Sequence, residues 1–359
     1  MAETAQIAEI ARIVSDEIFK PFGWERAGTS DHNFKGPIPH LSAGEPSADV
    51  DQAEADEASV SKEPKSAEVI SPSSALQLKD YPADVVFFYE DPYSLLRTYI
   101  HFDLKSYAAV TLKGSKVVGA LKSLSRAIAA AELSEDWSNK FAPQQSNYRI
   151  HGGLFVYNHD NLARGRFNEF FSKLTPHSAQ VPEKKNIYVF SPDRIGYLLS
   201  LLNDIKGLRA ESILPLQKDG EVLYYYPYGV KVKPLNNLLS YATAEMLLGP
   251  ILIVRYRFHD GSKQSGYIVY YDGPGAQVEE FLYIFELLLK RRLLTDTDAL
   301  HLRLQSPADN AFLVFKTAKD EFTKAYHDLP AFRKQVDEIK YGRGAKVQLE
   351  FSTVELGMD

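Results

Sequence analysis

The chain has 359 residues, of which 45% are hydrophobic and 12% aromatic. This composition supports a packed core and excludes a wholly disordered protein. The length leaves room for two domains of roughly 100–200 residues each. The chain has no cysteine, which excludes a disulfide framework, a thiolate zinc site and a cysteine nucleophile, and fits a cytoplasmic protein.

The net charge of -6 comes from a single segment. Between Glu45 and Glu68 there are eight acidic residues and two lysines, so the rest of the chain is neutral overall. A neutral body can carry a local basic surface, and the overall charge therefore does not exclude nucleic acid as a partner. We expect no signal peptide and no membrane partner, because the chain has no basic leader and no apolar run of roughly 18 residues.

Residues 1–160 predict one domain with a flexible insertion. Apolar residues at three- and four-residue spacing predict a helix over residues 1–22. Residues 35–80 are rich in Ser, Ala, Pro, Asp and Glu and predict a mobile acidic insertion. The remaining predicted elements are strands over 24–28, 83–89, 97–105 and 148–157 and a helix over 116–133.

Residues 161–359 predict a second, α+β domain. The pattern indicates strands over 187–190, 222–232, 251–258, 266–271, 300–304 and 347–351, and helices over 193–202, 278–294 and 312–326. No motif in this region indicates an enzymatic activity of its own. DNA binding, dimerisation and binding of a partner protein all remain open as its role.

The strand over 97–105 carries the candidate chemistry. Side chains alternate between its two faces, which puts Tyr99, His101, Asp103 and Lys105 on one face. Asp103 and Lys105 therefore project side by side, about 7 Å apart along the strand. A carboxylate holds a hard cation through oxygen, and a nearby lysine can orient or deprotonate water and stabilise developing phosphate charge.

Further ligands for a cation are available around this strand. Asp84 begins the preceding strand, and an antiparallel pairing with a short loop would bring it near Asp103. The backbone carbonyl of Leu104 can supply another oxygen, and Glu17 is a third carboxylate at the border of the predicted buried stripe of the first helix. The alternative is a plain Asp103–Lys105 ion pair, which stabilises little and needs no metal.

The stretches YPADVVFFY (81–89) and HFDLKSYA (101–108) resemble the PD-(D/E)xK nuclease superfamily. In that family an aspartate and a later (D/E)-x-K tripeptide lie on neighbouring strands of an αβββαβ core, and the element order predicted here is the same. The resemblance implies that Asp84, Asp103 and Glu17 bind metal and that Lys105 assists attack by water. In this chain Ala83 separates the proline from the aspartate.

The resemblance covers residues 1–160 and implies a restriction-endonuclease-like α/β fold. It implies a DNA endonuclease that depends on Mg²⁺ or Mn²⁺, similar to nuclease subunits of bacterial anti-phage defence systems. Such nucleases often act with a partner subunit, so we expect a partner protein or a homo-oligomer. The alternative is a non-catalytic interaction subunit that keeps a nuclease-like fold.

The tripeptide pattern by itself is not specific to one place in this chain. It recurs at Glu63-Pro64-Lys65, in the acidic insertion, and at Glu338-Ile339-Lys340, in a predicted helix. Only Asp103-Leu104-Lys105 ends an alternating strand that has an aspartate on the strand before it.

Three residues outside the tripeptide are candidates for contacts with phosphate. Ser106 follows the tripeptide directly, and Lys122 and Arg126 lie one turn apart on the helix over 116–133. Lysine, arginine and serine side chains are common ligands of the nucleic-acid backbone. The alternative for Lys122 and Arg126 is a solvated helical face.

Overall fold

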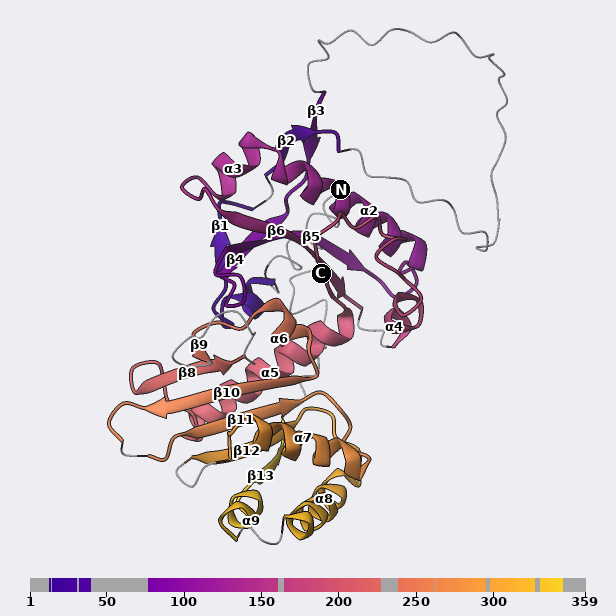
Figure 1. Cartoon of the computed structure of the whole chain (residues 1–359). Helices are drawn as coiled ribbons and strands as arrows, with labels where there is room; N and C mark the ends of the chain where they lie inside the picture. The colour runs from indigo at the N-terminus through magenta and orange to yellow at the C-terminus, as the bar shows by residue number, and fades with distance from the viewer. Residues whose placement is uncertain are drawn as a thin grey trace, which may run out of the picture.

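The computed structural model describes residues 13, 15–30, 32–39, 77–160, 165–226, 238–261, 263–294, 298–326 and 330–344. Two sheets lie one above the other, and helix α5 (Pro192–Ala210) runs between them (Figure 1). Helices cover the outer face of each sheet. The result is a mixed α/β protein built in layers.

The first sheet has the strand order β1-β4-β5-β6-β7. Strands β1, β4 and β5 are antiparallel neighbours, whereas β5, β6 and β7 run parallel. One face packs on α2 (Gly114–Glu132) and α3 (Glu135–Phe141), and the other on α5 and on the helical residues 15–19. The strands are β1 (Glu25–Ala27), β4 (Val85–Glu90), β5 (Arg97–Tyr107), β6 (Tyr148–Asn158) and β7 (Ile187–Phe190).

The order helix, β1, β4, β5, α2, β6 is the αβββαβ order that the sequence predicts. The faces of β5 also follow the predicted alternation. Ile100 and Phe102 lie in the core shared with α5, and Tyr99 lies in the core under α2 and α3. Asp103 and Lys105, which continue the series of Tyr99, therefore project on the α2 side of the sheet.

Two predicted boundaries differ from the structure. The ends of the predicted insertion, residues 35–80, are not loop but form the antiparallel pair β2 (Phe34–Pro37) and β3 (Leu78–Tyr81). The predicted domain boundary at residue 160 is not where the first sheet ends, because β7 is its fifth strand. Both errors arise from strand pairing between distant segments, which local periodicity does not register.

The second sheet has six strands in the order β13-β12-β11-β10-β8-β9. Strands β9, β8, β10 and β11 pair antiparallel, and β11, β12 and β13 run parallel. The strands are β8 (Gly220–Tyr225), β9 (Leu238–Leu239), β10 (Ile251–Phe258), β11 (Gly266–Tyr271), β12 (Ala299–Leu304) and β13 (Lys340–Arg343). The predicted strand over 347–351 lies outside the described residues.

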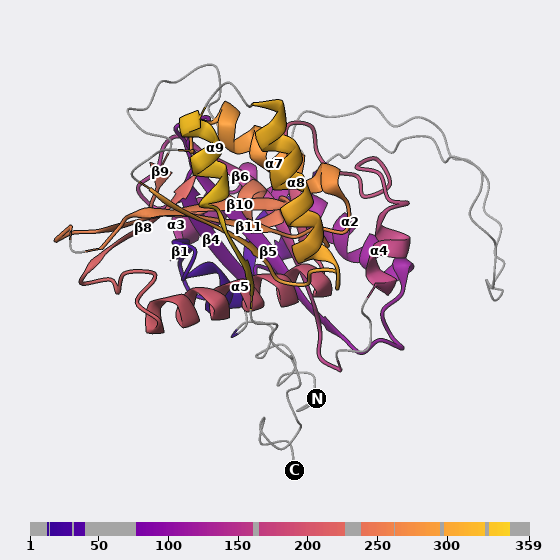
Figure 2. The same cartoon turned by 90° about the horizontal axis from the view of Figure 1, so that it is seen from below.

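The two faces of the second sheet have different partners. One face joins α5 and the first sheet in a single core, through side chains such as Tyr224, Val254 and Tyr270. The opposite face packs on α7 (Val278–Lys290) and α8 (Ala311–Ala325), with α9 (Pro330–Asp337) beside them (Figure 2). Two short helices complete the described elements, α4 (Arg166–Phe171) and α6 (Ala244–Leu248).

Strands β5 and β6 pack closely because glycine lies opposite a phenylalanine. Gly153 pairs with Phe102 in the parallel register, and a Cβ at Gly153 would fall on the ring of Phe102. Phe102 is fully buried in the core shared with α5. Because Gly153 has no side chain, the ring of Phe102 has room to pack against β6.

We expect Gly153→Ala to destabilise the protein by about 1–3 kcal/mol, since the added methyl group overpacks a filled core. The matched control is Gly119→Ala on α2, where a Cβ has no atom within 4 Å. That change removes a helix-interior glycine and should stabilise the protein by roughly 0.5–1 kcal/mol. Urea unfolding of both variants measures the two effects, and equal stability of the two variants would contradict this account of the packing.

Candidate active site

The register of β4 and β5 brings the two candidate aspartates together. Val85 pairs with Phe102 in the antiparallel ladder, so the next position along each strand sets Asp84 opposite Asp103. Residues directly opposite each other in an antiparallel pair have Cβ atoms roughly 4.5–5.5 Å apart. The two carboxylates therefore belong to neighbouring side chains on the α2 side of the sheet.

Hydrogen bonds and an ion pair hold these side chains in place. The backbone N–H of Leu104 donates to Oδ2 of Asp84, with 2.7 Å between the two atoms. The Lys105 ammonium forms an ion pair with Oδ1 of Asp103. The Asp103 side chain is 14% exposed and the Lys105 side chain 35%, so the group is shielded from water but remains accessible from one side.

The electrostatics of the site reflect two acids in a confined space. Burial first, and then the charge of Asp103, raise the pKa of the Asp84 carboxyl to about 6, against the opposing effects of the Leu104 N–H and the Lys105 ammonium. Burial opposes the charge on Lys105, but the neighbouring Asp103 and Asp84 carboxylates outweigh it and raise the pKa of the ammonium. Lys105 is therefore cationic at neutral pH and does not fully neutralise the pair of acids.

The donor set of this site fits a hard divalent cation. Two carboxylates whose mutual repulsion raises a pKa are stabilised by an added positive charge. Because the N–H of Leu104 points at Asp84 and the N–H and C=O of a strand residue share an edge, the Leu104 carbonyl also faces this side. Mg²⁺ commonly takes one or two carboxylates, with water and substrate phosphate completing its coordination.

Glu17 does not join this group. It is exposed, whereas Ser15, Ile18 and Phe19 are buried. The buried face of this helix therefore lies away from Glu17, so the prediction that Glu17 borders the buried stripe was wrong. Within the described residues, no group of three or more His, Cys, Asp or Glu side chains is arranged to hold a metal ion.

A buried histidine holds the backbone just before Asp84 in place. His101 lies on the same face of β5 as Asp103, and its Nε2 is 3.0 Å from the carbonyl oxygen of Pro82. Trp137 of α3 donates its indole N–H to Nδ1 of the same ring at 3.3 Å. Burial lowers the pKa of His101 to about 4, so the neutral ring donates through Nε2. Pro82 and Asp84 are in this way tied to β5 from two sides.

The three residues predicted to contact phosphate lie outside the group formed by Asp84, Asp103 and Lys105. The Ser106 hydroxyl is 3.1 Å from Nδ1 of His159, at the end of β6. Arg126 is exposed on α2, and its charge acts on Tyr81 of β3. Lys122 is partly buried one turn earlier on α2. Both cations are carried by the helix that covers the site's face of the sheet.

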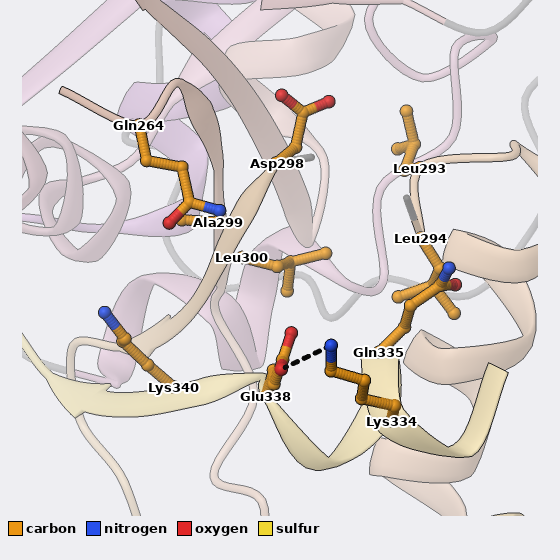
Figure 3. Close-up of a pocket in the computed structure, with 10 residues that line it drawn as sticks. All are labelled: Gln264, Leu293, Leu294, Asp298, Ala299, Leu300, Lys334, Gln335, Glu338 and Lys340. Atoms are coloured by element: carbon orange, nitrogen blue, oxygen red, sulfur yellow. Dashed lines mark ion pairs between the residues drawn. The ribbon is translucent and has the colours of Figure 1, made fainter. Parts of the chain in front are cut away.

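The rival tripeptide Glu338-Ile339-Lys340 lacks a convergent second acid. Glu338 and Lys340 line a hollow of about 460 Å³ beside β12 and α9, and Figure 3 shows the Asp298 carboxylate pointing away from Glu338. Glu338 pairs with Lys334 at 3.8 Å and Asp298 with Arg255 at 2.7 Å. Neither acid is left to share a ligand with the other. The tripeptide Glu63-Pro64-Lys65 lies outside the described residues.

Several residues of the site were not found by sequence reasoning. Trp137 has no motif, and only its position on α3 reveals its bond to His101. Asn158 and Asp160 hold the end of β5, since Asn158 donates to the Tyr107 carbonyl at 2.7 Å and Asp160 accepts from the Ala109 N–H at 2.8 Å. The polar run 158–160 at a strand end is a local signal for such an anchor.

The fold and the paired acids with their lysine define the class of the protein as a restriction-endonuclease-like α/β protein. Within that class, the model of the GAPS4 protein PD-(D/E)XK nuclease domain matches residues 1–194, and the chain belongs to this family of anti-phage defence nucleases. The match extends past β7, in agreement with the first sheet. No curated protein matches the chain, and no solved structure matches it.

The raised pKa of Asp84 predicts how stability depends on pH. A carboxyl whose folded pKa exceeds its unfolded value favours folding when protonated, and this contribution is lost as the pH rises from about 4 through about 6. Asp84→Asn replaces the titrating carboxyl with a neutral amide, so the variant does not lose stability in this way as the pH rises. In metal-free buffer we expect the stability of the variant relative to the wild type to grow between pH 4 and pH 7 by on the order of 2 kcal/mol and then to level off.

Urea unfolding of both proteins at several pH values measures this difference. The comparison between the two proteins is needed because His101, with its lowered pKa, gains stability as the pH rises and acts in the opposite direction. A stability difference that stays constant across the range would contradict the raised pKa of Asp84.

Proposed function

We propose that this chain is a divalent-metal-dependent DNA endonuclease of anti-phage defence, with Asp84, Asp103 and Lys105 as its active site. The observation that carries the proposal is the antiparallel register that sets Asp84 opposite Asp103, with Lys105 paired to the latter. Membership in the nuclease family supports the same reading. Asp84, Asp103 and the Leu104 carbonyl would hold Mg²⁺ or Mn²⁺, without Glu17.

The residues of the site suit hydrolysis of a phosphodiester bond. A bound cation would supply Lewis-acid stabilisation of the phosphate and acidify a water molecule. Lys105, a cation held beside Asp103, would orient the attacking water and stabilise the charge that develops on the phosphate oxygens. The Leu104 N–H and the bond from His101 to Pro82 would keep Asp84 in its orientation.

DNA as the substrate is supported by charge on α2. The helix carries Lys116, Lys122 and Arg126 and has a single acid, Glu132, at its end. In the described part of the chain no carboxylate pairs with these three cations. Phosphate contacts from such cations supply most of the sequence-independent affinity for a duplex.

The second sheet and its helices would bind DNA, dimerise or hold a partner subunit. Partner binding has a specific observation in its favour, because the first turn of α8 exposes Phe312 to 46% and Leu313 to 67%. Adjacent exposed apolar side chains are typical of protein interfaces. The described residues contain no helix able to cross a membrane.

Cleavage of plasmid DNA, linear DNA and RNA in Mg²⁺ or Mn²⁺ tests the proposed site. We expect Asp103→Ala and Lys105→Ala to lower the rate of DNA cleavage by about 10²- to 10⁴-fold, the usual effect of removing a group that acts on the reacting atoms. Glu286→Ala is the matched control, since it breaks an exposed ion pair with Lys290 on α7.

Metal binding provides a second readout that does not depend on turnover. Electron paramagnetic resonance of Mn²⁺ should show bound metal in the wild type and in Glu286→Ala, and weaker binding in Asp84→Asn. Equal cleavage by the wild type and both active-site variants would refute the site. Absence of metal-stimulated cleavage by the wild type would favour the non-catalytic interaction subunit, and preference for RNA would refute DNA as the substrate.

The contribution of α2 to substrate binding predicts a change in salt dependence. We expect Lys122→Gln and Arg126→Gln each to lower the slope of log affinity against log salt by about 0.9, because each removes one phosphate contact. Fluorescence anisotropy with a labelled duplex in metal-free buffer measures the slope. An unchanged slope in both variants would assign these cations to a solvated face.

A further inference from the structure

A tight loop leaves the catalytic strand and displays an exposed apolar side chain at its tip. Residues 108–113 connect β5 to α2, and Val110 in this loop is 80% exposed. This is the highest exposed fraction among the large apolar side chains of the described residues. A single exposed valine is unremarkable by itself, so its significance depends on how the loop is built and on what surrounds it.

Hydrogen bonds hold the loop in one conformation. The backbone N–H groups of Thr111 and Leu112 both donate to the carbonyl of Ala108, at 3.0 and 3.1 Å. The Asp160 carboxylate accepts from the N–H of Ala109 at 2.8 Å, and Asn158 donates to the carbonyl of Tyr107 at 2.7 Å. The loop is therefore fixed to the end of β6, and Val110 is presented on a rigid turn.

Cations flank the valine and connect it to the active site. Lys113 and Lys116 follow Val110 on the exposed start of α2, and no carboxylate of the described chain pairs with either. The ammonium of Lys116 lies 5.7 Å from the centre of the Tyr107 ring. The charge of Lys105 acts on the hydroxyl of the same tyrosine. Tyr107 therefore lies within reach of both cations, with Lys116 over its ring and the charge of Lys105 acting on its hydroxyl.

We propose that residues 108–113 form a substrate-positioning loop that enters the minor groove of duplex DNA, with Val110 as an apolar wedge and Lys113 and Lys116 on the flanking phosphates. The proposal rests on the proposed nuclease function for its substrate. It gives this loop a contact with DNA that is separate from the roles proposed for the two aspartates and for Lys122 and Arg126.

The dimensions of the loop favour the minor groove. A turn that presents one small side chain fits a groove about 6 Å wide, whereas the major groove, about 12 Å wide, accepts a whole helix. Apolar side chains inserted from the minor groove commonly separate base steps. The four steps along β5 from Asp103 to Tyr107 span roughly 14 Å of strand, so the loop would contact the duplex about four base pairs from the cleaved bond.

Binding of a labelled duplex and of the matching single strand, in metal-free buffer, tests the proposal. Val110→Ser removes the apolar contact at an exposed position, and we expect duplex affinity to fall about tenfold with the salt slope unchanged. Lys113→Gln should lower the salt slope by about 0.9. Single-strand affinity should change little in Val110→Ser, because a single strand has no minor groove.

The matched control is Leu133→Ser, at the opposite end of α2, where the leucine is 70% exposed. This variant should bind the duplex like the wild type. Duplex affinity of Val110→Ser equal to the wild type, or an equal loss on single strands, would overturn the proposal, as would failure of the wild type to bind any duplex. The binding assay requires neither metal nor cleavage, so its result is independent of the cleavage assay. A protein that does not cleave DNA but whose duplex binding depends on Val110 would refute the nuclease function and leave the role of the loop intact.

Discussion

The pairing register of β4 and β5 is the constraint on which the candidate site depends. Val85 opposite Phe102 sets Asp84 opposite Asp103, and a slip of one residue would turn one of the two acids to the other face of the sheet. The register is maintained by burial, because Val85 and Phe102 belong to the core shared with α5. The same core that joins the two sheets therefore also sets the distance between the acids.

Holding the Asp84 and Asp103 carboxylates together in a partly buried place costs free energy, and neighbouring groups offset part of that cost. Burial and the charge of Asp103 raise the pKa of Asp84, so the two carboxylates are held together against their repulsion. The Leu104 N–H and the Lys105 ammonium offset part of this repulsion. His101, bonded on both ring nitrogens, keeps the chain before Asp84 from moving away. Two carboxylates confined in this way are stabilised by an added positive charge.

Helix α2 links the site to the surface where a substrate would approach. Its buried side covers β5 and β6, and its other side carries cations that no described carboxylate neutralises. The loop before it is anchored by Asn158, the last residue of β6, and by Asp160, two residues farther on. Acids, cations and loop are therefore positioned by strands β4, β5 and β6 and by helix α2. The second sheet packs against this unit through α5.

The sequence alone was sufficient for the αβββαβ order and for the faces of β5, because alternation and spacing are local properties. Strand pairing between distant segments was decided only by the tertiary structure. It placed β7 in the first sheet and paired β2 with β3. Helix packing, likewise decided only in the tertiary structure, left Glu17 on the exposed face of its helix and brought Trp137 of α3 to His101. These contacts depend on which apolar faces pack together, and a single helix or strand does not carry that information.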